Sequence, residues 1–192
     1  MPAPVPCAVF VTLAFILAGV AQTWWFKSPR SARFAIPLDG GRTFRGRPLL
    51  GPNKTWKGFV VMVPATAFAF LALALLAPAV PALDRGLWPL SPPGFALLGI
   101  IAATGFMVGE LPNSLIKRQL GIAAGGAPRG RGVRGLAFVM DRLDSLLGML
   151  AAISLVVPTG WKLWALVLGV GPAIHWLFSV ALYLLGVKSR AA

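Results

Sequence analysis

Cysteine, histidine and acidic residues are scarce in this sequence of 192 residues. It has one Cys, one His and five Asp and Glu, against 18 Lys and Arg. The single cysteine, Cys7, excludes an intrachain disulfide and a metal cluster built from cysteines. The single histidine, His175, lies in an apolar segment, where a packing role is commoner than a ligand role. The sequence also shows no Ser-His-Asp set and no reactive cysteine, so nothing points to a covalent nucleophile.

Long hydrophobic runs, in contrast, fill most of the chain. Hydrophobic residues make up 57% and charged residues 12%, and the mean hydropathy is +0.79. A spanning helix needs ~20 apolar residues, and charge-free runs cover residues 1–26, 58–83, 86–109, 145–161 and 163–187. The first run lacks the basic n-region of a signal peptide, so we expect a retained helix.

These runs predict an all-α integral membrane protein with five transmembrane helices. We expect the helices at about 5–26, 58–81, 92–112, 136–160 and 163–186, within a single polytopic domain spanning residues 1–192. The fourth run is short, so its helix is expected to begin near Gly135 or Leu136. That start would place Asp141 and Asp144 in the first turns.

The basic residues predict the orientation of these helices. Eight Lys and Arg lie in residues 27–57 and six in residues 117–142, whereas only Arg85 and Lys162 fall on the opposite side. Lys and Arg accumulate on the cytoplasmic side, so we expect the N-terminus outside, the C-terminus in the cytosol and two long basic cytosolic loops. The protein is then integral to the cell membrane, with its site facing the cytosol.

The basic face has several interpretations. The insertion rule and attraction to anionic lipid explain part of it. Nucleic-acid binding is not expected, because the sequence shows no recognised nucleic-acid fold. The segment Gly121–Gly135, which is rich in Gly and Arg, fits either a simple basic connector or an anion-binding lid.

Three of the five acids lie in residues 110–145. An ionised group in hydrocarbon costs several kcal/mol, so carboxylates kept beside basic residues suggest a site for a metal and a phosphate. Glu110, Ser114 and Lys117 follow an i, i+4, i+7 spacing. They share one helical face if the helix continues through Pro112.

Asp141 and Asp144 have i, i+3 spacing on the predicted fourth helix. Two carboxylates this close repel each other unless a cation lies between them, and Arg142 points away from their shared face. Magnesium prefers a few carboxylates together with water and phosphate oxygens. The sequence therefore favours a metal site, and a salt-bridged helix end is the alternative.

The first loop contains a second group of candidate phosphate ligands. Gly46 and Gly51 have the spacing of a phosphate loop, but Pro52 stands where lysine is required, so this is not a Walker motif. Glycines with Asn53, Lys54 and Thr55 could still bind phosphate. Residues Asp39-Gly40 lack the other acids of a CDP-alcohol phosphotransferase, and that family is excluded.

Four features together carry a resemblance: Asp39-Gly40, the run Gly51–Gly58 (GPNKTWKG), an acid followed by Ser-x-x-Lys-Arg (Glu110, Ser114–Arg118), and Asp-x-x-Asp-Ser (Asp141–Ser145). In order and spacing the chain resembles the phosphatidate cytidylyltransferase superfamily. It is most similar to the short five-helix branch, the CDP-archaeol synthases and their bacterial relatives. Three features depart from that pattern: Glu110 replaces the usual Asp, Pro52 replaces an archaeal Asp, and the insert at 125–135 is longer.

The resemblance implies an enzyme that transfers CMP from CTP, its co-substrate, to a membrane lipid phosphate. The lipid could be phosphatidate-like or an isoprenoid ether glycerol phosphate, and the resemblance leaves this choice and the oligomeric state open. It implies one or two Mg²⁺ ions. The implied catalytic residues are Lys117, Arg118 and Asp144. The implied nucleotide- and phosphate-binding residues are Asp39, Asn53, Lys54, Thr55 and Ser114, and the implied metal ligands are Glu110, Asp141 and Asp144.

The alternative from another class is a non-catalytic small membrane transporter or lipid-binding scaffold. Acids within a membrane and bent helices also suit ion-coupled transport. Against this alternative, the acids of residues 110–145 lie at one end of the predicted helices and not at the membrane midplane.

Overall fold

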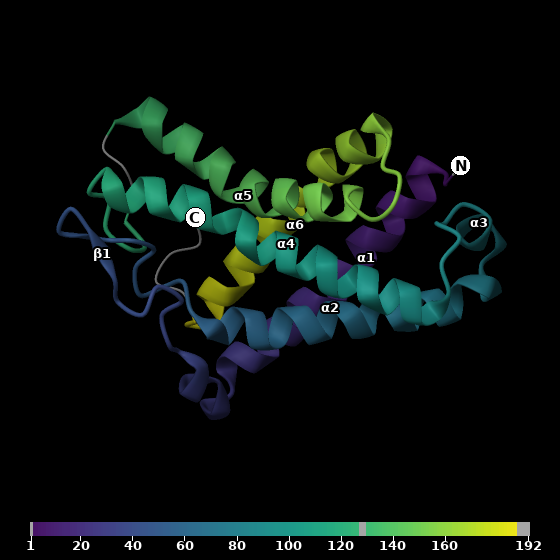
Figure 1. Ribbon diagram of the computed structural model, residues 1–192, viewed down its shortest axis with the longest axis horizontal. Coiled ribbons are helices and arrows are strands. Elements are labelled where there is room, and N and C mark those ends of the chain that lie inside the picture. The colour runs from purple at the N-terminus through teal and green to yellow at the C-terminus, as the bar shows by residue number, and fades with distance from the viewer. Residues whose placement is uncertain (1, 127–129, 188–192) are drawn as a thin grey trace.

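Five long helices dominate the computed structural model, which describes residues 2–126 and 130–187 (Figure 1). Arg129 and the C-terminal tail with Lys188 and Arg190 lie outside these residues. The long helices of the described part are α1 (Pro4–Lys27), α2 (Trp56–Leu76), α4 (Pro92–Gln119), α5 (Arg131–Ser154) and α6 (Trp161–Leu184).

Short elements connect the long helices. They are η1 (Pro29–Phe34), β1 (Thr43–Phe44), β2 (Arg47–Pro48), η2 (Ala77–Ala79) and α3 (Pro81–Asp84). The strands β1 and β2 pair antiparallel and are two residues long each, so the chain agrees with the expected all-α class and adds one short hairpin. Arg45 and Gly46, which join the strands, both have positive φ, as a two-residue hairpin turn requires.

Four helices in the described part are long and apolar enough to cross a membrane: α1, α2 together with η2, α4 and α6. This agrees with a membrane protein. Helix α5 has 24 residues but is not among the four, because it carries both Asp141 and Asp144 together with several arginines. The fifth span, the orientation and the single-domain assignment therefore stay predictions.

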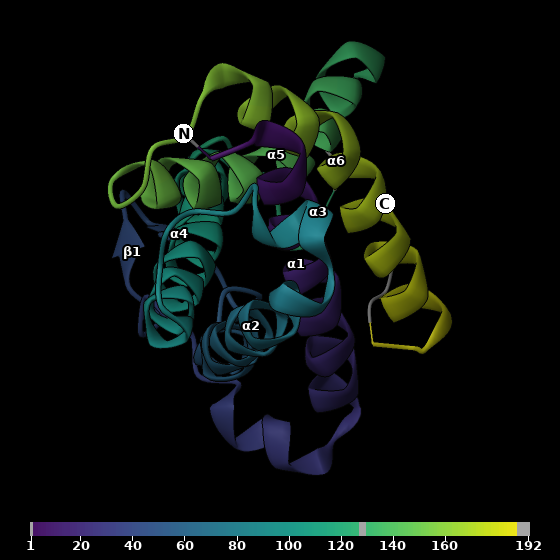
Figure 2. The same cartoon turned by 90° about the vertical axis from the view of Figure 1, so that its right-hand side faces the viewer.

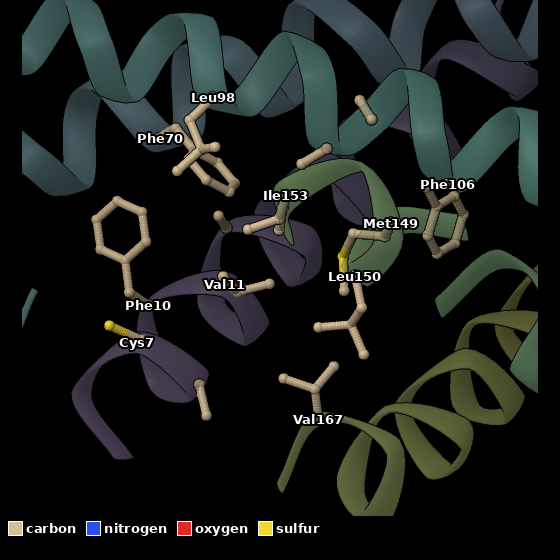
Figure 3. Close-up of a cluster of buried hydrophobic side chains, with 14 of the residues drawn as sticks. Cys7, Phe10, Val11, Phe70, Leu98, Phe106, Met149, Leu150, Ile153 and Val167 are labelled. Carbon is tan, nitrogen blue, oxygen red and sulfur yellow. The ribbon is translucent and has the colours of Figure 1, made fainter. Parts of the chain in front are cut away.

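The helices pack around one hydrophobic core. Helix α2 packs between α1 and α4, α5 packs against α4, and α6 packs against α1 and α5, an arrangement visible from the end of the bundle in Figure 2. Phe10 lies at the centre, with ring centroids 5.1 Å from Phe70 and 5.0 Å from Phe95. Figure 3 shows Leu98, Met149 and other buried residues in the same cluster. This core fixes α4 relative to α1 and α2.

Three helix boundaries differ from the expected ones. Helix α4 continues through Pro112 to Gln119, because the missing proline N–H removes only one bond and side chains of its last turns bond to α5. Helix α5 spans Arg131–Ser154, and not 136–160, so Asp141 and Asp144 lie deeper in the helix than its first turns. Helix α2 ends at Leu76, two residues before Pro78.

Candidate active site

The pair α4–α5 forms the frame of the site, and glycines set its geometry. A Cβ at Gly109 would lie 2.5 Å from the carbonyl oxygen of Asp144 and 2.9 Å from the Cα of Gly148. A Cβ at Gly105 would lie 2.5 Å from the carbonyl oxygen of Gly148. Only glycine allows such backbone contact. The crossing therefore places the segment of α5 before Gly148 beside the segment of α4 after Gly109.

Beyond the crossing, polar side chains join the two helices. Asn113 Nδ2 donates to Asp141 Oδ1 at 2.6 Å and to Asp144 Oδ2 at 2.8 Å. Lys117 forms an ion pair with Asp141. Ser145 Oγ donates to Glu110 Oε1 at 2.9 Å and to Asp144 Oδ1 at 3.3 Å. The structure thus brings all three predicted metal-ligating acids to one polar cluster.

Asp39 organises the first loop. Its Oδ2 accepts from the backbone N–H of Leu50 at 2.8 Å and of Gly51 at 3.1 Å, and its Oδ1 accepts from Gly41 N–H at 3.0 Å. Burial raises the pKa of Asp39, but these three N–H donors outweigh it and hold the pKa below its ordinary value. Asp39 therefore stays ionised and fixes the turn before Asn53.

The loop that Asp39 stabilises places Lys54 next to Glu110 in the polar cluster. Backbone bonds from Leu38 N–H to Lys54 O at 2.8 Å and from Trp56 N–H to Ile36 O at 3.0 Å anchor the segment just before α2. Lys54 forms an ion pair with Glu110. Residues 56 positions apart in sequence are thereby joined.

Two loops meet above the cluster. A Cβ at Gly51 would lie 3.3 Å from Arg118 Cδ, and a Cβ at Gly125 would lie 3.6 Å from Asn53 Nδ2. Arg118 also donates to the backbone carbonyl of Ile122, a bond that ties the end of α4 to the following loop. The first loop and the segment after α4 therefore share one surface.

A cavity of about 910 Å³ opens between these loops and the helices. Its lining includes every residue predicted for the site except Asp39: Asn53, Lys54, Thr55, Glu110, Ser114, Lys117, Arg118, Asp141 and Asp144. The structure does not bring Asp39 to the lining, and the contacts of this residue hold the loop together. The cavity also reaches apolar residues of α1 and α6, among them Phe15 and Phe178.

Sequence reasoning left two bridging residues out of the predicted site. Asn113 contacts both aspartates, and Ser145 links Glu110 to Asp144. Asn113 lies one turn before Lys117 and Ser145 follows Asp144 directly, so spacing alone could have suggested both. The partner across the helix pair, which gives each its role, is not visible in a spacing.

The oxygen donors of the cluster suit a hard divalent cation such as Mg²⁺, which prefers carboxylate oxygens. In the described residues, however, no group of three Asp, Glu, His or Cys side chains converges as metal ligands do. Lys54 and Lys117 take up a carboxylate oxygen of Glu110 and of Asp141. The carboxylate oxygens therefore fit a divalent metal ion. In this structure the positive charge beside Glu110 and Asp141 comes from lysine side chains.

Comparisons with known proteins identify the family of the chain. A family model described as CarS-like, CDP-archaeol synthase matches residues 33–191. Curated CDP-archaeol synthases from Halobacterium salinarum and Halorubrum lacusprofundi are each 37% identical to this chain, covering 80% of it and 82% of their own length. One from Methanopyrus kandleri is 36% identical and covers 79% of this chain and 77% of its own. No solved structure matches.

These matches confirm the resemblance expected from the four sequence motifs, and with it an enzyme of the CTP-dependent cytidylyltransferase class. A non-catalytic transporter or scaffold is set aside. The chain belongs to the CarS-like family of CDP-archaeol synthases.

Proposed function

We propose that this protein transfers CMP from CTP to an ether-linked isoprenoid glycerol phosphate, in a reaction that depends on Mg²⁺. Its relatives are named CDP-archaeol synthases, which favours the ether lipid over a phosphatidate-like acceptor. The observation that carries the proposal is one continuous cavity, which joins a cluster of lysines and carboxylates to an apolar lining. A water-soluble nucleotide and a membrane lipid can both reach such a cavity.

In the proposed reaction an oxygen of the lipid phosphate attacks the α-phosphorus of CTP. The bond from that phosphorus to the oxygen bridging to the β-phosphorus breaks, and pyrophosphate leaves with its electron pair. The nucleophile belongs to the lipid, so the protein needs no covalent nucleophile. The protein's work is to orient the two phosphates and to stabilise charge as it develops.

The basic residues are proposed to bind the phosphates. Lys54, Lys117 and Arg118 lie on two sides of the cavity and supply three positive charges. Asn53, Thr55 and Ser114 supply neutral donors from the first loop and from α4. When a nucleotide enters, we expect Lys54 and Lys117 to exchange their carboxylate partners for phosphate oxygens.

Glu110, Asp141 and Asp144 are proposed to hold Mg²⁺. The ion, when bound, neutralises charge on phosphate oxygens and on the leaving pyrophosphate. Asn113 and Ser145 fix the positions of the acids relative to one another, because each bonds to two of them. The number of ions is one or two.

The cavity is proposed to face the cytosol, where CTP is found. The support is the number of basic residues in the two loops that border it. Cysteine-free protein with single cysteines introduced at Arg45 or at Lys162 can be labelled from outside intact cells. Labelling at position 162 alone supports this orientation, and labelling at position 45 alone contradicts it.

The function is tested with purified protein in detergent, labelled CTP and a panel of lipid phosphates. We expect formation of a CDP-lipid and release of pyrophosphate, faster with ether-linked isoprenoid glycerol phosphate than with phosphatidate. Chelation with EDTA should abolish turnover, and added Mg²⁺ should restore it. Absence of a CDP-lipid with every acceptor in the panel would overturn the proposal, and full turnover in EDTA would overturn its metal part.

A further inference from the structure

Arg142 is a buried arginine of α5 without an ion pair in the described part of the chain. Its side chain is 7% exposed. Its Nη1 donates to the carbonyl oxygen of Phe138 at 2.7 Å, and its guanidinium carbon lies 3.3 Å from the centroid of the Phe138 ring. Its Nε is buried and has no hydrogen-bond partner among the described residues. A buried charge without a counter-ion is costly, so the position is suited to an anion.

Two of the three acids in the polar cluster, Glu110 and Asp141, are already paired with lysines. Both ion pairs in residues 2–126 and 130–187 use lysine: Lys54 with Glu110, and Lys117 with Asp141. The adjacent Asp141 pairs with Lys117 of α4, and no ion pair joins it directly to Arg142 in the described residues. An anion from outside the chain would supply both a directly bonded counter-ion and an acceptor for Nε.

Arg142 faces the α6 side of α5, whereas the neighbouring acids Asp141 and Asp144 bond to α4. Leu146, one turn after Arg142 on the same side of α5, packs on α6, where a Cβ at Gly171 would lie 2.6 Å from Leu146 Cδ1. Arg142 itself lines the cavity. The cavity therefore has two charged sides, one facing α4 and the other facing α6.

Apolar residues line much of the α6 side of the cavity, which also carries His175 and Ser179. Phe15 and Gly19 of α1 and Phe178 and Leu182 of α6 line it, and Gly19 approaches the Phe178 ring so closely that a Cβ there would lie 2.8 Å from it. A charged headgroup with two hydrocarbon chains needs a cation next to such a lining. A triphosphate has no hydrocarbon chains to fill an apolar lining of this extent.

We infer that Arg142 binds a phosphate group in this cavity, and that the phosphate is the headgroup of the acceptor lipid and not a phosphate of CTP. The guanidinium can offer two parallel N–H donors to one phosphate, which an ammonium cannot. Stacking on Phe138 holds the guanidinium plane in place before the lipid arrives. This inference rests on the proposed function for the identity of the lipid.

Kinetics of Arg142→Gln, Arg142→Lys and a control, Arg33→Gln, test the inference in mixed micelles. Arg33 is exposed on η1, outside the cavity lining. For Arg142→Gln we expect the KM for the lipid phosphate to rise about 10- to 100-fold, with the KM for CTP within about twofold of wild type. Arg142→Lys should recover part of the loss, and Arg33→Gln should match wild type. A rise in the KM for CTP alone, or unchanged kinetics, would overturn the inference.

A binding measurement separates failure of this inference from failure of the proposed function. Thermal unfolding in detergent is followed with dialkylglycerol phosphate, with the same dialkylglycerol lacking phosphate, and with pyrophosphate. We expect the phosphate-bearing lipid to raise the wild-type midpoint more than the phosphate-free lipid, and this difference to vanish in Arg142→Gln. If the difference persists, Arg142 does not bind the lipid phosphate. If wild type makes no CDP-lipid but shows the difference, only the proposed function fails.

A loss of the pyrophosphate effect in place of the lipid effect would assign Arg142 to the nucleotide and overturn the lipid assignment. The midpoints without ligand show whether each variant folds. If Arg142→Gln does not fold, the comparison of Arg142→Lys with wild type tests the inference instead. Lysine keeps the positive charge but lacks the paired N–H donors of the planar guanidinium. An unchanged lipid effect and lipid KM in Arg142→Lys would then overturn the inference.

Discussion

The two halves of the α4–α5 pair are held together by different interactions. In one half, Gly105 and Gly109 touch Gly148 through backbone atoms, and the surrounding core is apolar. In the other half, six polar side chains of α4 and α5 bridge the helices through hydrogen bonds and an ion pair: Glu110, Asn113, Lys117, Asp141, Asp144 and Ser145. All of them except Ser145 border the cavity. Figure 1 shows α5 crossing α4 and leaving it toward its own N-terminal end.

The contrast shows how a pair of helices can hold charges at a defined spacing. A salt bridge alone gives little net free energy to hold two helices at one separation. The cost of removing its charges from water offsets much of their attraction. Backbone contact at glycines has no such cost and tolerates little displacement. The close-packed half therefore sets the separation of the helices, and the polar half uses that separation for binding.

The largest effect is expected from Asp144→Asn, which alters the polar half alone. Asparagine keeps the volume and one acceptor oxygen but loses the negative charge. We expect turnover to fall by about 10³-fold, measured as pyrophosphate release over a range of Mg²⁺ concentrations. The thermal midpoint should stay close to wild type. Near-normal turnover would remove Asp144 from the metal and catalytic roles.

Gly109→Ala alters the close-packed half. A methyl group there would collide with the Asp144 carbonyl and with Gly148, so we expect a loss of about 1–3 kcal/mol of stability. Turnover should fall by about 100-fold, since a small displacement of the acids misaligns the reacting groups.

Gly169→Ala is the matched control, because a Cβ at this position on α6 meets nothing within 4 Å. It should be neutral or slightly stabilising. Thermal unfolding and turnover are measured for both variants. Full activity in Gly109→Ala would show that the glycine crossing does not set the site.

Lys54→Ala tests the loop that reaches the polar half from outside the helix pair. It removes the partner of Glu110 and one proposed phosphate ligand. We expect the KM for CTP to rise by about 10-fold or more, with a smaller effect on the KM for lipid. Lys162→Ala, at the start of α6 beside Trp161, removes a lysine remote from the cavity and should leave both constants unchanged. An unchanged CTP dependence in Lys54→Ala would exclude Lys54 from the site.

The smallest effect is expected from Asp39→Asn, which lies outside the cavity lining. The amide cannot accept all three N–H bonds, so the loop before Asn53 loosens and turnover falls by about two- to fivefold. The pKa of Asp39 is below its ordinary value of 3.8, so its contribution to loop stability is complete above pH 3.8. That contribution is lost as pH falls through the lower folded-state value.

Hydrogen exchange at the Leu50 and Gly51 amides, followed from pH 5 downward, measures this effect. After correction for intrinsic exchange rates, protection in wild type should decrease at the acid end of the range, whereas Asp39→Asn should be weakly protected throughout. A loss of CTP binding as severe as in Lys54→Ala would instead assign Asp39 to the nucleotide site.

The sequence was informative about the helices and about most site residues. Charge-free runs located α1, α2, α4 and α6, because each run has the length and hydropathy of a membrane span. The spacing of Glu110, Ser114 and Lys117 identified one helical face, and the structure shows that the helix does continue through Pro112. The motifs also identified the family, which the comparisons confirm.

Other features could not be predicted from local patterns. The start of α5 at Arg131 was missed, because the glycines and arginines before Leu136 resemble a loop. Asp39 was assigned to the nucleotide, whereas its oxygens bond to the backbone of Leu50 and Gly51. The helical position of Arg142 placed it off the shared face of its neighbouring acids, but only the structure shows that its guanidinium is buried and lines the cavity.

By itself, the sequence determined that this chain is built of apolar helices, with a few charges gathered in short motifs. Hydropathy and helical spacing are local properties and depend on no distant partner. Only the tertiary structure decided which charges meet. Lys54 reaches Glu110, and Asn113 joins both aspartates, because glycines bring α4 and α5 into backbone contact and the Asp39 loop folds over their polar ends.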